Sequence, residues 1–277
     1  MTRLEWLRYV KGRYEEKGIG EAEAEPRHLI ADILDIEISD IFTKGYEPVG
    51  KEQGKQIEAA LTRREQGEPL AYITGKRWFM GMEFAVDRRV LIPRQETELL
   101  AEEAIALAGT DSRILDLCTG SGCVAVSVAL KTGAEVTASD ISKDALETAK
   151  KNADRYGVQI RFVESDLFCG IQSAFHVITA NPPYIDAEQM KKLDVQVEAY
   201  EPHLALFGGV DGLDFYRRIV PQALAALERG GVLLMEIGWD QGEPVRKMME
   251  AYGYREIEIK KDYAGLDRLV KGVKADV

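Results

Sequence analysis

Cysteine and histidine are scarce in this sequence. Its 277 residues include three cysteines, Cys118, Cys123 and Cys169, and three histidines. No two cysteines have the Cys-x-x-Cys spacing and the histidines lie far apart, so the sequence predicts neither a disulfide framework nor a zinc site. We therefore expect a protein that works in a reducing compartment and without a metal ion.

Long apolar runs are also missing. No stretch of about 18 apolar residues is present that could span a bilayer. The first residues, MTRLEWLRYVKGRYEEKG, mix charges into the apolar positions, which is unlike a secretory signal. The sequence therefore predicts a cytoplasmic protein with no membrane partner.

Positive charge is in deficit, with 36 Lys and Arg against 47 Asp and Glu and a net charge of -11. Surfaces that bind nucleic acid neutralise phosphates with Lys and Arg, so this balance disfavours a large surface of that kind. A local basic groove would still be compatible with it.

The chain is long enough for about two domains, and 45% apolar content with 30% charged residues is typical of a globular protein. Apolar residues at helical spacing predict a helical domain over residues 1–73. In KRWFMGMEFAVD, aromatic and β-prone residues flank Gly81, which predicts a β-hairpin linker over residues 74–90. Strands and helices then alternate over residues 91–277.

Seven apolar segments of this last part are expected to be strands. They read RILDLCT, EVTASD, QIRFVESD, FHVITAN, GVLLMEIG, REIEIKKD and RLVKGV. Alternation of strands with helices predicts an α/β fold with a doubly wound, mostly parallel sheet.

Three motifs occur where these strands are expected to end, and ligands of such sheets bind beside the carboxyl ends of strands. In DLCTGSGCVA, Asp116 closes a strand, and Gly120 and Gly122 permit a tight turn before a helix with free N–H groups. Asp140 ends the next strand. An acidic side chain roughly 20 residues further along the chain is typical of sites that bind ribose hydroxyls. Asp166 ends the strand after that. Together they predict a site for an adenosine-containing cofactor.

Each motif alone has a simpler explanation, because glycine after a strand often only makes the turn and a strand-terminal aspartate often caps a helix. The loop also departs from the G-x-G-x-x-G fingerprint, with Cys118 at its first position and Ala125 at its last. No Walker lysine follows the loop. These departures disfavour nicotinamide enzymes and nucleoside triphosphatases.

The stretch ITANPPYIDA, residues 178–187, ends the fourth expected strand. Proline has no N–H and restricts the residue before it, so the strand must stop at Asn181 and leave that residue extended. The Asn181 side chain and the nearby carbonyls then form a rigid group of acceptors beyond the sheet edge. An isolated Asn-Pro pair would be interpreted as an ordinary turn.

The succession LDLCTGSG, Asp140, Asp166 and NPPY resembles the S-adenosylmethionine-dependent methyltransferases that modify planar amino groups. GEPLAYITGKRWFMGMEF, VLIPRQETELL, EPHLALFGGVDGLDFYR and DYAGLDRLV are similar to stretches of the glutamine N5-methyltransferases of peptide chain release factors. The resemblance covers nearly the whole chain. It implies a class I, Rossmann-like methyltransferase fold behind a helical domain that helps to recognise the release factor. The implied substrate is the glutamine of the Gly-Gly-Gln motif of a bacterial class I factor.

The resemblance also implies roles for twelve residues. Five would form the cofactor loop: Cys118, Thr119, Gly120, Ser121 and Gly122. Three would bind the adenosine part, with Asp140 at the ribose and Asp166 and Leu167 beside the adenine. Four would form the substrate site: Asn181, which also borders the cofactor, Pro182, Pro183 and Tyr184. Cys118 stands where glycine is common in methyltransferases.

A carboxamide nitrogen is a poor nucleophile, because its lone pair is delocalised into the carbonyl. The Asn181 side-chain oxygen and the Pro182 carbonyl can each accept one N–H of such an amide, which fixes it and concentrates electron density on nitrogen. Tyr184 would supply a flat apolar wall over the amide.

Other functions are compatible with the same motifs. A glutamine of a ribosomal protein would need the same chemistry, as would an exocyclic amino group of a base flipped out of DNA or RNA. The net negative charge disfavours the nucleic-acid substrate. A non-catalytic cofactor-binding or scaffolding protein would not need the intact NPPY motif.

Overall fold

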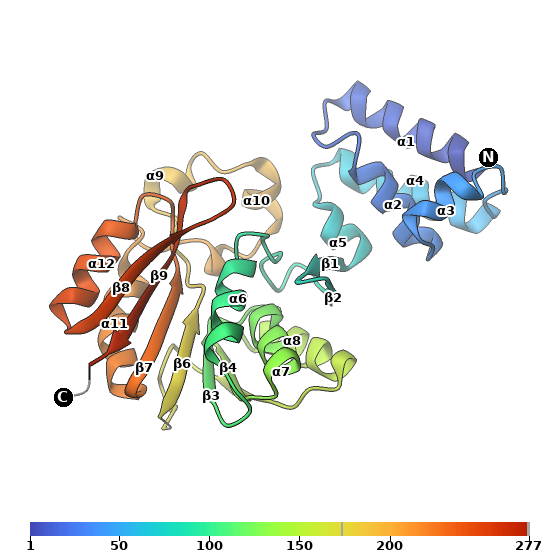
Figure 1. Ribbon diagram of the computed structural model, residues 1–277. Coiled ribbons are helices and arrows are strands. Elements are labelled where there is room, and N and C mark those ends of the chain that lie inside the picture. The colour runs from blue at the N-terminus through green and yellow to red at the C-terminus, as the bar shows by residue number, and fades with distance from the viewer. Residues whose placement is uncertain (173, 276–277) are drawn as a thin grey trace. The chain divides into compact units, whose positions relative to one another are not determined.

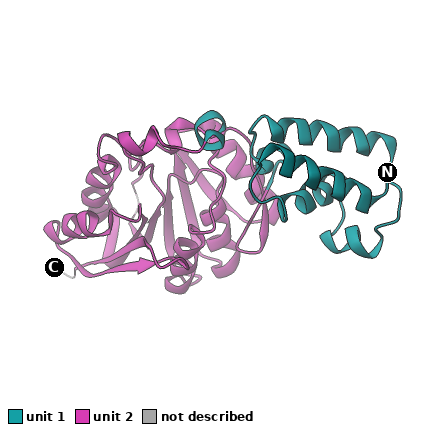
Figure 2. Ribbon diagram, turned by 90° about the horizontal axis from the view of Figure 1, so that it is seen from above, with its two compact units in different colours: residues 1–76, 195–200 teal, residues 77–194, 201–277 magenta. Residues whose placement is uncertain are grey.

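The computed structural model describes residues 1–172 and 174–275. The chain divides into two compact units, which Figure 2 draws in different colours. Unit 1 comprises Met1–Lys76 together with Val195–Tyr200, and unit 2 comprises Arg77–Asp194 and Glu201–Val277. Residues 173, 276 and 277, which fall in the last expected domain, lie outside the described residues.

Unit 1 is helical, as predicted for the first part of the chain. Its helices are α1 (Arg3–Lys17), α2 (Glu25–Leu34), α3 (Ile38–Thr43), α4 (Lys51–Glu65), α5 (Leu70–Thr74) and α10 (Val195–Tyr200). The helices α1 to α4 share one apolar core, in which Trp6, Val10, Leu29, Ile41 and Ile57 are buried. Packing of these amphipathic faces, more than intrinsic propensity, stabilises such short helices.

A short hairpin opens unit 2, with β1 (Lys76–Phe79) paired to β2 (Met82–Ala85). Met80 and Gly81 form its turn with φ of 52° and 73°. Positive φ at both central residues suits the twist of two-residue hairpins. Phe79 and Phe84 are buried in the same apolar cluster as side chains from helices of unit 2.

Unit 2 is built on a seven-stranded sheet with the order β5-β4-β3-β6-β7-β9-β8 (Figure 1). The strands are β3 (Arg113–Leu117), β4 (Glu135–Asp140), β5 (Ile160–Glu164), β6 (Phe175–Ala180), β7 (Leu227–Glu236), β8 (Tyr254–Lys261) and β9 (Asp267–Lys274). The five strands from β5 to β7 are parallel, and β9 runs antiparallel to β7 and β8. The predicted α/β class and mostly parallel sheet are confirmed.

Helices cover both faces of the sheet (Figure 1). The helices α6 (Glu98–Leu107), α7 (Cys123–Thr132) and α8 (Lys143–Tyr156) lie on one face, and α11 (Asp214–Ala226) and α12 (Gly242–Ala251) lie on the other. Two short helices, α9 (Ala187–Met190) and the 3-10 helix η1 (His203–Ala205), follow β6.

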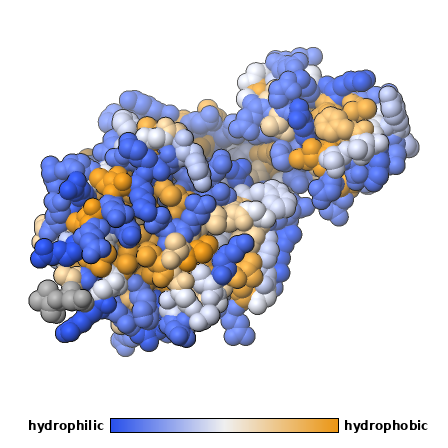
Figure 3. Space-filling view, in the orientation of Figure 1, coloured by the Kyte–Doolittle hydropathy of each residue, from blue (hydrophilic) through white to orange (hydrophobic). Residues whose placement is uncertain are grey.

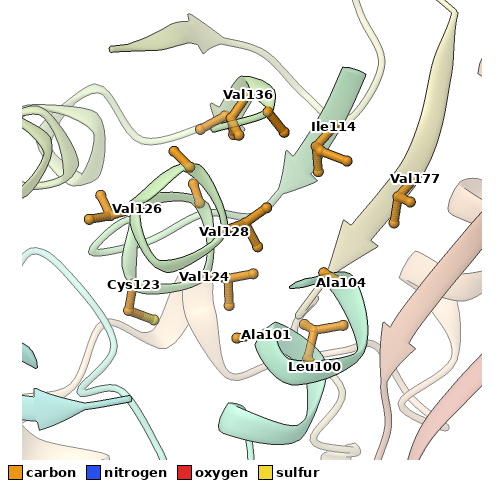
Figure 4. Packing of buried hydrophobic residues seen from close by; sticks show 14 of the residues in the cluster. Leu100, Ala101, Ala104, Ile114, Cys123, Val124, Val126, Val128, Val136 and Val177 are labelled. Carbon is orange, nitrogen blue, oxygen red and sulfur yellow. The ribbon is translucent and has the colours of Figure 1, made fainter. Parts of the chain in front are cut away.

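Alternate residues of each central strand enter different cores, because successive side chains of a strand point to opposite faces. Ile114 and Val177 belong to the cluster beneath α6 and α7, while their neighbours Leu115 and Ile178 belong to the cluster beneath α11 and α12. Figure 4 shows the first cluster, with side chains of α6 and α7 facing strand residues such as Val136. Burial on both faces explains why these strands read as continuous apolar runs.

The order in which strands are added to the sheet reverses at β3. The chain runs from β3 outward through β4 to β5 and then returns to the other side of β3 as β6. Ligands of open α/β sheets bind outside the strand ends at this kind of switch point. Leu117 pairs with Ala180 there, so the segments that follow β3 and β6 leave the sheet side by side.

No helix within residues 1–172 and 174–275 is long and apolar enough to cross a membrane. On the face shown in Figure 3, hydrophilic residues cover most of the surface of each unit, and hydrophobic residues form patches among them.

Candidate active site

A pocket lies beside the ends of β3, β4, β5 and β6. Nine of the twelve residues singled out in the sequence line it: Cys118, Thr119, Gly120, Ser121, Asp140, Asp166, Leu167, Asn181 and Pro183. The other three, Gly122, Pro182 and Tyr184, belong to the same loops but are not part of this lining. One cavity therefore joins the glycine loop, the two strand-end carboxylates and the first residue of NPPY.

The loop between β3 and α7 has an unusual backbone. Cys118, Gly120 and Gly122 have φ of 56°, 53° and 78°. Glycine adopts such angles without strain, whereas a residue with a Cβ atom is strained by about 1 kcal/mol or more. Cys118 therefore occupies a conformation that favours glycine.

Helix α8 holds this loop from behind. A Cβ atom at Gly122 would lie 2.9 Å from the Cβ of Ala149, so only glycine lets the loop approach the helix this closely. One turn further along α8, the buried Asn152 amide donates to the carbonyls of Ser121 at 2.9 Å and Ala85 at 3.0 Å. The loop is thus fixed by shape and by hydrogen bonds.

Asp116 places a buried carboxylate in the pocket wall. Its side chain is 2% exposed, and its two oxygens accept hydrogen bonds of 2.6 Å from the hydroxyls of Thr119 and Thr179. Burial disfavours the charged form and raises the Asp116 pKa to about 6, although the two hydroxyls act in the opposite direction. A cationic ligand in the pocket would favour the charged carboxylate.

Asp140 is the last residue of β4. Its Oδ2 accepts from the backbone N–H of Gly120 and its Oδ1 from that of Ser142, both at 2.9 Å. These bonds aim the carboxylate across the glycine loop, and its remaining lone pairs can accept from ligand hydroxyls. Burial raises the Asp140 pKa above its usual range.

The adjacent loop after β5 combines a charged and an apolar residue. Asp166 lies two residues beyond the strand and pairs with the Arg218 guanidinium at 2.7 Å. Leu167 is buried with φ of 54°, and the Ser165 hydroxyl donates to its carbonyl at 2.8 Å. Leu167 lines the pocket together with Phe215, which provides an apolar place for a flat ring.

Asn181 follows β6 directly and its side chain is oriented by Thr97. The Asn181 amide nitrogen donates to the Thr97 hydroxyl at 3.2 Å. Because the nitrogen is engaged, the side-chain oxygen is the atom left to accept from a ligand. Thr97 immediately precedes α6, and it lines the same pocket.

Tyr184 and Glu236 meet behind the pocket. The Tyr184 hydroxyl donates to Glu236 Oε1 at 3.4 Å, and the Tyr184 ring packs against the core beneath α11 and α12. Burial raises the Glu236 pKa to about 7, while the nearby Thr97 hydroxyl acts in the opposite direction. Glu236 ends β7, so this carboxylate also lies at a strand end.

The backbone of the NPPY segment is held by the following loop. Gly208 donates to the Ile185 carbonyl at 2.9 Å, and a Cβ atom at Gly208 would lie 2.7 Å from both the Pro183 carbonyl oxygen and the Tyr184 Cα. The Gln241 amide donates to the Tyr184 carbonyl at 2.9 Å. Two separate elements therefore fix the segment that carries Asn181.

A partly buried ion pair joins two loops at the pocket. Glu201, whose side chain is 2% exposed, accepts from the Arg94 guanidinium and from the Ile92 N–H at 3.2 Å. Arg94 lines the pocket, as do Pro93 and Pro202 beside these residues. The pair holds the PRQETE segment against the loop after NPPY.

Several positioning residues were not found from the sequence: Thr97, Asn152, Glu236 and Gln241. Glu236 carried a usable signal, because it ends a strand in GVLLMEIG as Asp140 does in EVTASD. The other three act through contacts that span many residues, such as the bond from Asn181 to Thr97, and no local pattern indicates them. Among the described residues, no group of three or more His, Cys, Asp or Glu side chains could hold a metal ion.

Two family models match this chain. The one described as PrmC N-terminal domain matches residues 5–75, and the one described as methyltransferase small domain matches residues 95–199. The second range contains the glycine loop, both strand-end carboxylates and NPPY.

Relatives match over nearly the full length. The release factor glutamine methyltransferase of Geobacter sulfurreducens is 37% identical over 271 residues, covering 97% of this chain and 94% of the relative. That of Cereibacter sphaeroides is 40% identical over 273 residues, covering 98% of both. A methyltransferase structure from Pyrococcus furiosus has a TM-score of 0.56 at 17% identity, covering 82% of this chain and all of the other, and indicates a shared fold.

Proposed function

The chain belongs to the release factor glutamine methyltransferase family, and from this membership we propose that it methylates the Gly-Gly-Gln glutamine of bacterial class I peptide chain release factors. The methyl group goes from S-adenosylmethionine to the side-chain amide nitrogen, N5. The observation that carries the proposal is that Asn181 lines the same cavity as the glycine loop and Asp140. The acceptor amide and the cofactor can therefore meet in one place.

The pocket residues fit S-adenosylmethionine. The buried Asp116 carboxylate offers a negative charge for a cation, Asp140 offers acceptors for ribose hydroxyls, and Leu167 with Phe215 offers an apolar site for adenine. Gly120 has no atom within 4 Å of where its Cβ would be, so its bare backbone faces open space that a ligand can fill. Bound S-adenosylmethionine supplies an electrophilic methyl group on a sulfonium sulfur.

The protein has to orient and polarise the substrate amide. The Asn181 side-chain oxygen accepts one N–H of the glutamine carboxamide and the Pro182 carbonyl accepts the other, which turns the nitrogen lone pair toward the methyl group. The prolines and the glycine contacts around Tyr184 keep these acceptors in place. Tyr184 lies behind these acceptors, with its ring against the core beneath α11 and α12.

We further propose that the helical domain, residues 1–73, helps to recognise the release factor, with the hairpin of residues 74–90 as linker and residues 91–277 as the catalytic domain. The match of residues 5–75 to a family model separate from the methyltransferase model supports this division. The protein substrate is consistent with the excess of 47 acidic over 36 basic residues, which disfavours a nucleic-acid substrate.

The proposal is tested by transfer of labelled methyl from S-adenosylmethionine. The purified protein is offered a class I release factor, the same factor with the Gly-Gly-Gln glutamine replaced by alanine, a ribosomal protein and duplex DNA. Label on the intact factor alone is the expected result. Label on ribosomal protein or DNA would replace the proposed substrate, and cofactor binding without any transfer would contradict enzymatic function.

A further inference from the structure

Two buried carboxamides hold the backbone of the two halves of the pocket from behind. Asn152 of α8 is 0% exposed, Gln241 immediately before α12 is 7% exposed, and neither is part of the pocket lining. Burying an amide costs free energy unless its polar atoms find partners, and an apolar residue would pack into a core more favourably. What each amide binds therefore indicates its role.

Asn152 joins the cofactor loop to the last residue of the hairpin. Its Oδ1 accepts from the Ala85 N–H at 2.8 Å, and its amide nitrogen donates to the carbonyls of Ala85 at 3.0 Å and Ser121 at 2.9 Å. These bonds use the oxygen and both hydrogens of the amide, which fixes its orientation. An ionised aspartate of the same shape could not donate to the two carbonyls, and leucine could form none of the three bonds.

The Ser121 carbonyl belongs to a peptide group that is held from both sides. The N–H of the same group, contributed by Gly122, donates to the Thr119 carbonyl at 2.8 Å. Ser121 and Thr119 line the pocket, and the glycine on either side of Ser121 leaves this backbone easy to turn. Without the Asn152 amide the peptide group could rotate, and the wall that meets the cofactor would change shape.

Gln241 holds the far end of the NPPY segment in the same manner. Its amide nitrogen donates to the carbonyls of Tyr184 at 2.9 Å and Gly212 at 3.3 Å, and its Oε1 accepts from the Gly238 N–H at 2.9 Å. The orientation of this amide is therefore fixed as well. Methionine would fill a similar space and form none of these bonds.

The NPPY segment has little freedom between its two ends. At one end Ala180 is paired with β3 and β7, and at the other the Tyr184 carbonyl is bound by Gln241. The two prolines between them have a nearly fixed φ. The Pro182 carbonyl, which accepts one substrate N–H in the proposed mechanism, lies between these anchors. A shift at Tyr184 would therefore displace that acceptor.

We propose that the two carboxamides control different quantities, Asn152 the affinity for the cofactor and Gln241 the rate of methyl transfer. Each is a positioning residue, because it acts on backbone that borders a ligand. The Gln241 half rests on the proposed function, since transfer is measured as methylation of the release factor. The Asn152 half requires only that the pocket binds the cofactor.

The test measures two quantities on the full chain carrying Asn152→Leu or Gln241→Met. One is the Kd of S-adenosylhomocysteine by calorimetry, and the other is kcat for release factor methylation at saturating cofactor. The two substitutions keep the approximate size of each side chain and remove its hydrogen bonds. Should either variant fail to fold, Asn152→Ala or Gln241→Ala removes the same bonds without steric conflict and takes its place.

Two matched controls separate positioning from loss of stability. The Tyr156 hydroxyl, one turn after Asn152 on α8, donates to the Glu83 carbonyl of the hairpin at 2.7 Å. The Tyr254 hydroxyl donates to the Val220 carbonyl at 2.9 Å in the core beneath α11 and α12. Tyr156→Phe and Tyr254→Phe each lose a hydrogen bond to backbone outside the cofactor loop and NPPY. They report what destabilisation alone does to Kd and kcat.

The two variants should show opposite signatures. Asn152→Leu should raise the Kd about tenfold, because affinity falls in proportion to the fraction of molecules whose loop is ready to bind, and change kcat by less than about threefold. Gln241→Met should lower kcat by about tenfold to a hundredfold, as a misplaced reacting group does, and change the Kd by less than about threefold. Both controls should stay within about threefold of wild type in both quantities.

The inference is overturned if Asn152→Leu binds the cofactor as its control does, if Gln241→Met turns over as its control does, or if both variants change Kd and kcat alike. Failure of the proposed function has a different signature, because the wild-type protein would then bind the cofactor and methylate no release factor. The Kd of Asn152→Leu would still decide the first half of the inference.

Discussion

Leu117 of β3 and Ala180 of β6 are partners in the sheet, and each is the last residue of its strand. The cofactor loop starts one residue after Leu117, and NPPY starts one residue after Ala180. A register shift of one residue would turn the side chains of a strand to the opposite face, so this pairing decides which atoms meet in the pocket.

Asn181→Ala should reduce kcat strongly. If one preorganised acceptor is worth as much as one oxyanion-hole donor, the loss is about 3 kcal/mol, or about 10² to 10³ in rate. Cofactor affinity should change little, which calorimetry with S-adenosylhomocysteine can check. A loss of only about tenfold would rule out the proposed role of Asn181.

Affinity for S-adenosylmethionine should rise with pH through the Asp116 pKa of about 6. Above that pH the carboxylate is charged and attracts a cation, and below it the neutral acid does not. Well below the pKa the affinity should fall by up to about tenfold per pH unit.

The contribution of the sulfonium charge can be isolated with S-adenosylhomocysteine, which lacks it. Calorimetric Kd values for the two ligands should diverge as the pH rises through about 6, and Asp116→Asn should abolish the divergence. A ratio of affinities that stays constant with pH in the wild-type protein would contradict this role of Asp116.

Cys118→Gly should be tolerated, because it relieves a φ of 56° in a residue with a Cβ atom. The gain of about 1 kcal/mol is partly offset by the greater flexibility of glycine in the unfolded chain. Cys118→Ala keeps the strain without the thiol, and Cys118→Val adds β-branching, which is least compatible with positive φ. Urea unfolding should rank glycine at or above alanine and valine last. A valine variant as stable as wild type would disprove strain at this position.

Gly122→Ala should destabilise the protein more than Gly157→Ala. Both glycines have positive φ, at 78° and 64°, but a Cβ atom meets Ala149 at 2.9 Å only at Gly122 and finds open space at Gly157. Backbone strain should cost about 1 kcal/mol at both positions, with about 1–3 kcal/mol more from the contact. Adding Ala149→Gly should recover part of the extra loss. Equal effects of the two single variants in urea unfolding would show that the contact is unimportant.

The strands of unit 2 could be predicted because they are buried on both faces. Segments such as EVTASD carry uninterrupted apolar and β-prone residues, and Glu135–Asp140 is the strand observed. The strand ends followed from local chemistry as well, since Pro182 could not continue the ladder beyond Asn181. The expected topology alone therefore predicted that the residues at these strand ends lie near one another.

The groups behind the pocket could not be predicted in the same way. Thr97 lies in PRQETE, where nothing local distinguishes it from a helix cap, and its partner Asn181 is 84 positions away. Gln241 reaches the Tyr184 carbonyl across 57 positions. Such pairs depend on how the elements pack, and a single sequence contains no record of that packing.

The division of the chain affects how its helical unit can be exchanged or synthesised. Unit 1 includes α10, and the Tyr200 hydroxyl donates to the Gln66 carbonyl at 3.0 Å within that unit. A chimera that grafts only the first 76 residues onto a relative would thus leave out its last helix. During translation the ribosome must also have finished β3, β4, β5 and β6 before this helix can join the unit. The helical unit, whose first helices are made before any strand of the large sheet, is therefore completed only after four of the five parallel strands have been made.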